Sequence, residues 1–408
     1  MKSIREPGGP APLAELRDAD APRAAEVREA QGWTFAVRAT ERDSFTEYHL
    51  TGTVERAGRA IDELLAHAAA VMAERGIQTI QEKFYGNRTA RTDVLRRRET
   101  AYRREELDFG VPVTWIEGAP LVETEFAGFQ IWGITPRDAR MGVTTVTSPA
   151  AGSGRLWTGR GFRLLHLAAV RGTQPDGALA AGPAAQADRM FTNAGAALKS
   201  LGFEYRQVSR TWIYLARLLE WYGDFNRVRT AHYQRVGFSA AGALPFPAST
   251  GIQGRSGDDE CIMDLLALQS DSPDRAAALP IRRSPRQDSS FSYGSAFSRG
   301  MALAIEGRRT VHVSGTASID AAGASVHVGD AELQSLETLL CIAAILEEQG
   351  GSLENITSAT LFCKTTAALE AWNRVTRLLR VPAFPKVCMF ADVCRPDLLV
   401  EMEAVATI

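Results

Sequence analysis

The chain has 408 residues, of which 45 % are hydrophobic and 23 % are charged, with a formal net charge of −2 at neutral pH. This length is too great for one ordinary hydrophobic core and predicts two or three domains of a globular protein. The charge balance provides no basic footprint for nucleic acid, and no apolar run is long enough to predict a membrane span.

Residues 1–32 are rich in Ala, Pro, Arg and Glu, and we expect them to form a mobile leader. The same order of predicted strands and helices then recurs three times, at 33–135, 157–269 and 291–408. Linkers rich in Pro, Gly and Ser are expected between the copies, at about 136–156 and 270–290. Each copy opens with a strand that ends in Gly-Thr, and these strands are 48–53, 167–173 and 311–316.

Each copy continues with an apolar-periodic helix that stops near a glycine, the usual residue for a left-handed helix end. The expected helices are 57–75, 186–201 and 332–349. A strand follows in each copy, and these strands are 79–85, 208–215 and 356–363. Second helices are expected to begin near Thr92, Asp224 and Ala367, before two closing strands. This β-α-β-α-β-β unit buries one sheet face under two helices, which is an α+β architecture.

The last closing strand alternates apolar side chains with the carboxylates of Glu401 and Glu403. A carboxylate on the pocket side of such a strand is costly to ionise, so its pKa rises and it becomes a candidate proton donor. The alternative is that both acids face water at a sheet edge.

Only one of the three closing strands is predicted to supply an acid to an interface between copies. Aligning them places Met263 opposite Glu401, and the first copy has no acid within Phe126–Gln130. We therefore expect one active interface, lined by the third copy and a neighbour. The alternative is that all three interfaces are structural, because a fold alone does not confer function.

Cysteine and histidine spacing predicts neither disulfides nor a metal site. The five cysteines are odd in number and lack CxxC spacing, which favours reduced thiols in a cytoplasmic protein. The six histidines are scattered and form no HExxH motif, so we predict no metal. We expect no cofactor either.

Several motifs of the third copy carry a family resemblance. They are Phe297-Ser298-Arg299, Val313–Ile319, Gly329-Asp330 with Gln334, Phe384-Pro385, Cys394-Arg395 and Glu401–Glu403. On these residues the chain resembles the Rid (YjgF) superfamily, whose small subunits form trimers with pockets between neighbours. The resemblance implies three tandem Rid-like units, with the chorismate-mutase-like fold, forming an intramolecular pseudotrimer.

A narrower resemblance rests on the Ser-Gly-Thr-Ala-Ser run, His327, Gln334, Glu337-Thr338 and the ending from Cys394 to Glu401. Here the chain is similar to the chorismatases, which remove pyruvate from chorismate to give a cyclohexadiene diol acid or a hydroxybenzoate. A cysteine at the place of Cys394 shapes the pocket in chorismatases that make 3-hydroxybenzoate. Its alternative role is that of a small buried strand residue.

The chemistry of an enol ether assigns candidate roles to particular residues. The ether breaks once a proton reaches its terminal methylene carbon, and Glu401 is the candidate catalytic acid. A small-molecule carboxylate substrate needs cations, so Arg299, Arg395 and Arg210 are candidates, although each could equally form a surface salt bridge. The other candidate substrate-binding residues are Ser314, Gly315, Thr316 and Thr250 in backbone turns, and Cys394, Tyr214 and Phe297, with Trp212 and Tyr293, in the pocket walls.

Two departures from the family keep other functions open. Simple Rid deaminases carry an arginine soon after the proline turn, whereas this chain reads Lys386-Val387-Cys388 after Pro385. The middle copy also runs differently from the chorismatases. Two alternative functions therefore remain: an enamine or imine hydrolase, and a non-catalytic small-molecule binder or assembly partner. Separately, the fused pseudotrimer could be monomeric or form a homo-oligomer.

Overall fold

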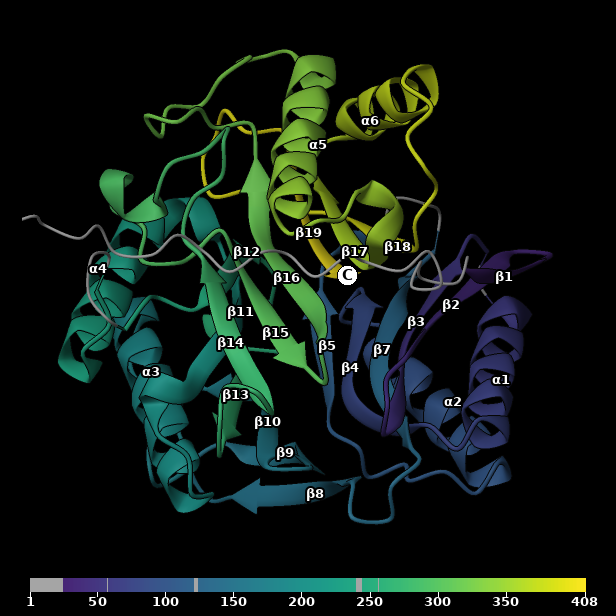
Figure 1. The fold of residues 1–408 in the computed structure, drawn as a ribbon. Coiled ribbons are helices and arrows are strands. Elements are labelled where there is room, and N and C mark those ends of the chain that lie inside the picture. The colour runs from purple at the N-terminus through teal and green to yellow at the C-terminus, as the bar shows by residue number, and fades with distance from the viewer. Residues whose placement is uncertain (1–24, 57, 121–123, 240–243, 256) are drawn as a thin grey trace, which may run out of the picture.

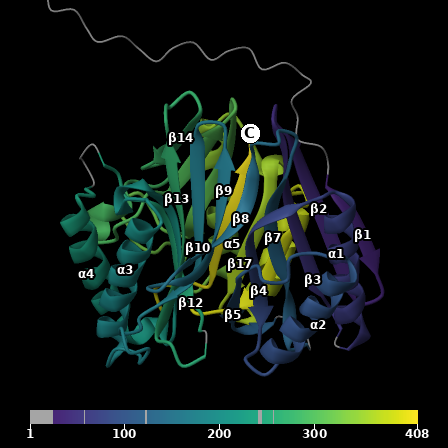
Figure 2. The ribbon, with the colours of Figure 1, turned by 90° about the horizontal axis from the view of Figure 1, so that it is seen from below.

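The computed structural model describes residues 25–56, 58–120, 124–239, 244–255 and 257–408 (Figure 1). These residues form three mixed sheets, and a pair of long helices covers the outer face of each sheet (Figure 2). No helix among them is both long and apolar enough to cross a membrane.

The first sheet has the strand order β1-β2-β3-β7-β4-β5 and is covered by α1 and α2. Its elements are β1 (Glu26–Ala30), β2 (Trp33–Glu41), β3 (Phe45–Val54), α1 (Arg59–Glu74), β4 (Gln78–Gly86), α2 (Arg91–Arg104), β5 (Val113–Glu117) and β7 (Phe126–Pro136). The short strand β6 (Ala119–Pro120) leaves this sheet and pairs with the third one.

The second sheet has the order β12-β11-β13-β10-β9-β8 and is covered by α3 and α4. Its elements are β8 (Gly142–Ser148), β9 (Gly152–Gly159), β10 (Phe162–Arg171), α3 (Pro183–Ser200), β11 (Val208–Leu215), α4 (Leu218–Val236), β12 (Ala248–Gln253) and β13 (Cys261–Ser270).

The third sheet has the order β14-β15-β16-β19-β17-β18-β6 and is covered by α5 and α6. Its elements are β14 (Ala276–Ile281), β15 (Gly300–Ile305), β16 (Arg308–Ala317), α5 (Ala331–Glu348), β17 (Ile356–Cys363), α6 (Thr366–Leu378), β18 (Lys386–Phe390) and β19 (Val400–Thr407). Short 3-10 turns at Tyr205–Gln207, Ser290–Tyr293 and Leu353–Asn355 complete the chain.

The same five-strand core recurs in all three sheets, as β2-β3-β7-β4-β5, β9-β10-β13-β11-β12 and β15-β16-β19-β17-β18. The predicted three-repeat α+β fold is therefore confirmed. Helices α1, α3 and α5 begin within three residues of their predicted starts, because their apolar stripes face the sheet and fix their extent.

The predicted linkers and leader are shorter than expected. Strand β8 and most of β9 lie in the predicted linker at 136–156, β14 lies in the one at 270–290, and β1 lies at the end of the predicted leader. Strands β1, β8 and β14 are edge strands with many exposed side chains, so their sequences lack the apolar alternation of a core strand. Residues 1–24 of the leader lie outside the described residues.

The inner faces of the three sheets meet in one shared core, which contains Trp132 and Trp157, Trp212 and Met301 among many others. Each sheet is thus buried on both sides, by its own helices outside and by the other two sheets inside (Figure 2). A side chain that points inward from a middle strand ends up near the centre of the molecule, far from water.

Candidate active site

A cavity of about 240 Å³ lies between the second and third repeats. The second repeat contributes α4 and β12, and the third contributes β16, β19 and the segments around residues 293–299 and 394–395. The residues that line it are Tyr222, Asn226, Arg229, Ser249, Gly251, Tyr293, Ser295, Phe297, Arg299, Gly315, Ala317, Ile319, Cys394, Arg395 and Glu401.

Glu401 is the acid of this cavity. Strand β19 pairs it with Ala317 on one side and Phe362 on the other, and only 4 % of the residue is exposed. Its carboxyl group lies against Gly315, where an added Cβ would be 2.2 Å from Glu401 Oε1, so a larger residue there would displace the carboxyl group. The alternative that both acids face water is wrong, since Glu403 is 5 % exposed.

Burial raises the pKa of Glu401 to about 8, with a further contribution from the negative charge of Glu403 and a partial opposition from Arg210. The carboxyl group therefore holds its proton at neutral pH. A protonated carboxyl in an enclosed cavity can serve as a general acid.

Three arginines line the cavity, and each uses a hydrogen bond to a neutral partner. Arg229 Nη2 donates to Asn226 Oδ1 at 2.7 Å, and Arg299 Nε donates to the carbonyl of Asp288 at 2.9 Å. Arg395 Nη1 donates to a serine hydroxyl at 3.2 Å.

No carboxylate forms an ion pair with any of these three arginines within the part of the chain that the structure describes. Arg229 Nε and Arg299 Nη2 are buried without a hydrogen-bond partner there. Buried cations are costly unless they are paired, so an anionic group that entered the cavity would find cations without a carboxylate partner.

The remaining walls are aromatic and sulfur-containing. The guanidinium of Arg299 lies over the rings of Tyr293 and Phe297, 5.4 and 5.6 Å from their centroids. Burial raises the pKa of Cys394 to about 12, and the nearby Glu401 adds to this effect, so the thiol is neutral. Cys394 is thus a wall residue and no nucleophile.

The structure brings seven of the predicted site residues together around this cavity: Glu401, Arg299, Arg395, Gly315, Cys394, Phe297 and Tyr293. Thr250 lies just behind them, and its hydroxyl accepts a hydrogen bond from the Gly315 N–H at 3.0 Å. Ser314 and Thr316 do not line the cavity. These residues lie at a bulge of strand β16 and do not form the predicted turn: the Ser314 hydroxyl donates to the Ser298 carbonyl at 2.6 Å, and the Thr316 hydroxyl donates to the Ser314 carbonyl at 2.8 Å, so both support the bulge.

Arg210 and Tyr214 lie outside the cavity, contrary to their predicted position in it. Both are inward-facing residues of β11, whose inner face points to the centre of the molecule. Arg210 Nη2 donates to Glu403 Oε2 at 2.8 Å, so its charge is engaged within the protein. Trp212, between them in sequence, lines the central chamber described below.

Sequence reasoning missed the contribution of α4, which supplies Tyr222, Asn226 and Arg229. Trp221, Phe225 and Arg229 follow at four-residue spacing on the buried side of this helix. A cationic residue at the next position of an apolar helical stripe, as Arg229 is here, indicates a charged side chain on the buried side of the helix.

The strand register corrects the alignment of the closing strands by one residue. Met263 pairs with Ile213 and Val170, as Met402 pairs with Leu361 and Thr316, so these two methionines are equivalent. The position of Glu401 is taken by Ile262 in β13 and by Gly128 in β7, neither of which is an acid. The position of Glu403 is taken by Asp264 and Gln130, and this second acid was missed.

The corresponding interface between the first and second repeats also has a hollow, of about 380 Å³. It is lined mainly by Ala, Pro and Gly residues, and its one charged residue, Arg171, donates to Asp259 at 2.9 Å. This hollow therefore has neither the acid nor the unpaired cations of the cavity between the second and third repeats.

Comparisons with known proteins bear on both the third repeat and the whole chain. The family model described as Endoribonuclease L-PSP matches residues 295–408. The 3-aminoacrylate deaminase RutC of Acinetobacter baylyi is 35 % identical over 97 residues, which cover 24 % of this chain and 77 % of that protein.

A crystal structure of a chorismatase matches most of the fold. The match covers 81 % of this chain and 93 % of that chain, with a TM-score of 0.57 and 19 % sequence identity. At this identity the similarity is one of fold, and it extends over all three repeats.

Proposed function

The chain belongs to the Rid superfamily and resembles the chorismatases, and on this basis we propose that it releases pyruvate from chorismate or a related enol-ether carboxylate. The observation that carries the proposal is Glu401, a carboxyl group that holds its proton at neutral pH inside a cavity of unpaired arginines.

In the proposed reaction, the Glu401 carboxyl transfers its proton to the terminal methylene carbon of the enolpyruvyl group, which becomes a methyl group. The positive charge that develops on the neighbouring carbon is shared with the ether oxygen. Water adds to this carbon and gives one proton to the Glu401 carboxylate, and the product of this step is a hemiketal. The bond from this carbon to the ether oxygen then breaks, while the hemiketal hydroxyl loses its proton and the ether oxygen gains one, so that pyruvate and the alcohol are released.

The arginines Arg229, Arg299 and Arg395 would hold the carboxylates of the substrate, since a cation that lacks a carboxylate partner in the protein gains most from an anionic ligand. Tyr293 and Phe297 would pack against its ring. The position of Cys394 in the wall supports a role in product choice between a dihydrodiol acid and a hydroxybenzoate.

Pyruvate release tests this proposal. Purified protein is incubated with chorismate, and pyruvate is followed with lactate dehydrogenase and NADH. Glu401→Gln should lower the rate about 10²–10⁴-fold, because it removes the proton donor while keeping the shape. The matched control is Glu370→Gln, a largely exposed residue of α6, which should retain full activity. The absence of pyruvate above background from the wild-type protein would refute the proposal.

A second candidate is hydrolysis of an enamine or imine, and the similarity to a 3-aminoacrylate deaminase favours it. The same neutral acid would protonate the enamine carbon. Against it, β12 begins Ala248-Ser249-Thr250, so the arginine that simple Rid deaminases carry after the proline turn is absent, and the arginines of this cavity come from other elements. A 2-aminoacrylate hydrolysis assay run beside the chorismate assay separates the two functions.

A further inference from the structure

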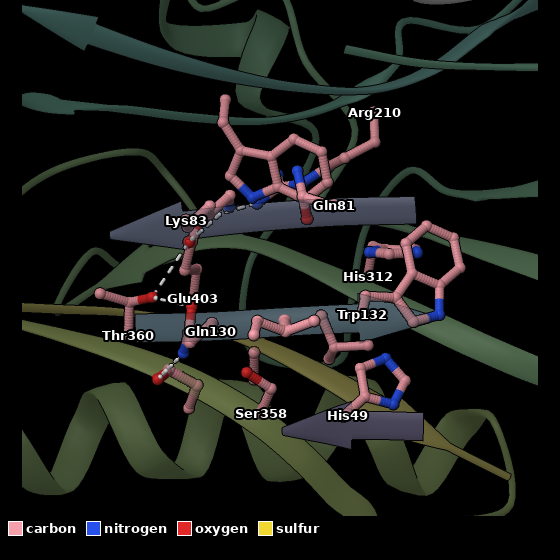
Figure 3. Close-up of a pocket in the computed structure, with 15 residues that line it drawn as sticks. His49, Gln81, Lys83, Gln130, Trp132, Arg210, His312, Ser358, Thr360 and Glu403 are labelled. Carbon is pink, nitrogen blue, oxygen red and sulfur yellow. Dashed lines mark hydrogen bonds and ion pairs between the residues drawn. The ribbon is translucent and has the colours of Figure 1, made fainter. Parts of the chain in front are cut away.

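A cluster of charged residues lies at the centre of the molecule, where the three sheets meet (Figure 3). Each repeat supplies one member: Lys83 comes from β4, Arg210 from β11 and Glu403 from β19. All three are at most 5 % exposed, and they border a chamber of about 40 Å³.

The cluster is arranged around the carboxylate of Glu403. Its Oε2 accepts hydrogen bonds from Arg210 Nη2 at 2.8 Å and from Thr250 Oγ1 at 2.5 Å. Its Oε1 lies 3.6 Å from Lys83 Nζ and accepts from Thr360 Oγ1 at 3.3 Å. Two cations and two hydroxyl donors thus surround one carboxylate, which favours its ionised form.

Thr250 joins this cluster to the cavity. Its hydroxyl oxygen lies 2.6 Å from Arg210 Nη2 and accepts from the Gly315 N–H, and Gly315 is the residue against which the Glu401 carboxyl lies. Glu401 and Glu403 are two residues apart on one face of β19, so the two carboxyl groups are neighbours.

We propose that Lys83 is a positioning residue for the proton of Glu401: together with Arg210 it keeps Glu403 ionised, and that negative charge keeps the proton on Glu401. The first repeat, which contributes no residue to the cavity lining, would in this way take part in its chemistry. The functional consequence rests on the proposed role of Glu401 as general acid.

The charged and titratable groups around the pair support this assignment. Facing Glu401 are Glu403, Arg210, the neutral Cys394 and Tyr222, and the cavity arginines Arg229, Arg299 and Arg395. Facing Glu403 are Lys83, Arg210 and the neutral Tyr85 and Tyr214, and Asp264 in turn faces Lys83. Burial acts to raise the pKa of Glu403, but Lys83, Arg210 and the two threonines outweigh it and lower the pKa below its ordinary value.

The second repeat shows what the arrangement looks like without an acid pair. Asp264 occupies the place of Glu403 and accepts from Thr114 at 2.7 Å and from the Ala169 N–H at 2.8 Å. Two residues before it stands Ile262 instead of a second acid. A carboxylate at this position therefore helps to hold the repeats together, and only in the third repeat does it have another carboxyl group to influence.

Two substitutions should move the titration of the pair in different directions. Glu403→Gln removes the negative charge, so the pKa of Glu401 should fall by about one to two pH units. Lys83→Met destabilises the ionised form of Glu403. Glu403 then competes with Glu401 for one proton, and the pKa at which the Glu401–Glu403 pair loses this shared proton rises. The fraction of protein with the proton on Glu401 then falls, and so should kcat.

The measurement has two parts. Infrared difference spectra against Glu401→Gln follow the protonated carboxyl group as a function of pH, without substrate. The pH profile of pyruvate release follows the same group through its activity. Glu403→Gln should move the high-pH limb of both curves to lower pH. Lys83→Met should lower kcat by about tenfold at pH 7 without moving that limb downward.

Lys83→Arg keeps the charge and should restore the wild-type profile, whereas Lys364→Met, which removes a half-buried surface lysine paired with Asp392, is the control without effect. If Lys83→Met does not fold, the double variant Lys83→Met/Glu403→Gln removes both charges together and should titrate like Glu403→Gln. The proposal would be overturned if the infrared titration curves and pH profiles of Glu403→Gln and Lys83→Met coincided with those of the wild type, or if both variants shifted them equally. Because the infrared titration needs no turnover, it stands even if chorismate is not the substrate.

Discussion

At the scale of single residues, Glu401 couples the chemistry of the cavity to the stability of the protein. Its pKa is about 8 in the folded protein against an ordinary value of 4.5. The folded state thus keeps a proton that the unfolded chain releases. The stability from this group is complete below pH 4.5 and is lost as the pH rises towards 8.

Glu401→Gln should therefore stabilise the protein at high pH, because the neutral amide carries no cost of ionisation. We expect a gain of roughly 2–4 kcal/mol in the free energy of unfolding at pH 8 and almost none at pH 4. Urea unfolding at the two pH values measures it, with Glu370→Gln as the control. A loss of stability at pH 8 would contradict the position of the proton.

Gly315 is the residue that gives the Glu401 carboxyl its place. In Gly315→Ala the new Cβ would lie 2.2 Å from Glu401 Oε1 and 3.0 Å from the Thr250 methyl group. Since something must shift, we expect pyruvate release to fall at least about tenfold, with a loss of about 1–3 kcal/mol in stability. Gly223→Ala in α4 meets no atom within 4 Å, and should raise stability by about 0.5–1 kcal/mol at unchanged activity.

At the scale of elements, α4 is a support helix of the second repeat that also reaches into the cavity. Arg229→Met removes a buried guanidinium and keeps most of its bulk, so the KM for chorismate should rise about 10- to 100-fold. Arg227→Met, whose side chain is 77 % exposed on the same helix, should leave KM unchanged. Steady-state kinetics of both variants test this, and equal values of KM would remove Arg229 from substrate binding.

The elements also show what the sequence can predict. Periodicity located α1, α3 and α5, because each buries a regular face against its own sheet, and the strand 356–363 was located as a run of residues that are all buried. It did not reveal which neighbour an inner face meets, so Arg210 was assigned to the wrong cavity. Bulges between Val313 and Thr316 and between Ile356 and Ser358 shift the pairing within the sheet, and this hides the register of the closing strands from simple alignment. Arg229 was missed because the cavity that it lines is completed by residues of another repeat.

At the scale of the whole molecule, a buried ion pair holds the first and third repeats together. Arg42 pairs with Glu47, and it also donates to the Ile305 carbonyl at 3.0 Å and to the Thr310 hydroxyl at 2.7 Å. Burial acts to raise the pKa of Glu47, but Arg42 and the hydrogen bonds outweigh it and lower the pKa to about 2. This group therefore stabilises the protein above its ordinary pKa of 4.5, and the stability is lost as the pH falls towards 2.

Arg42→Met should leave the carboxylate of Glu47 buried and without its cation. We expect a loss of about 3–5 kcal/mol at pH 7 that becomes smaller as the pH falls below 4, measured by urea unfolding. Arg59→Met, which breaks an exposed pair with Glu63, should cost less than about 0.5 kcal/mol at either pH. A similar small loss in Arg42→Met would show that this ion pair is dispensable.

The strand β6 has a consequence for how the polypeptide matures. Ala119 and Pro120 form their ladder with Phe390 and Met389, about 270 positions later in the chain. Almost the entire polypeptide must therefore be synthesised before β6 can pair with β18. We expect this contact between the first and third repeats to form after the individual repeats have folded. Until Met389 and Phe390 have been synthesised, β6 has no strand in its own chain with which to form this ladder.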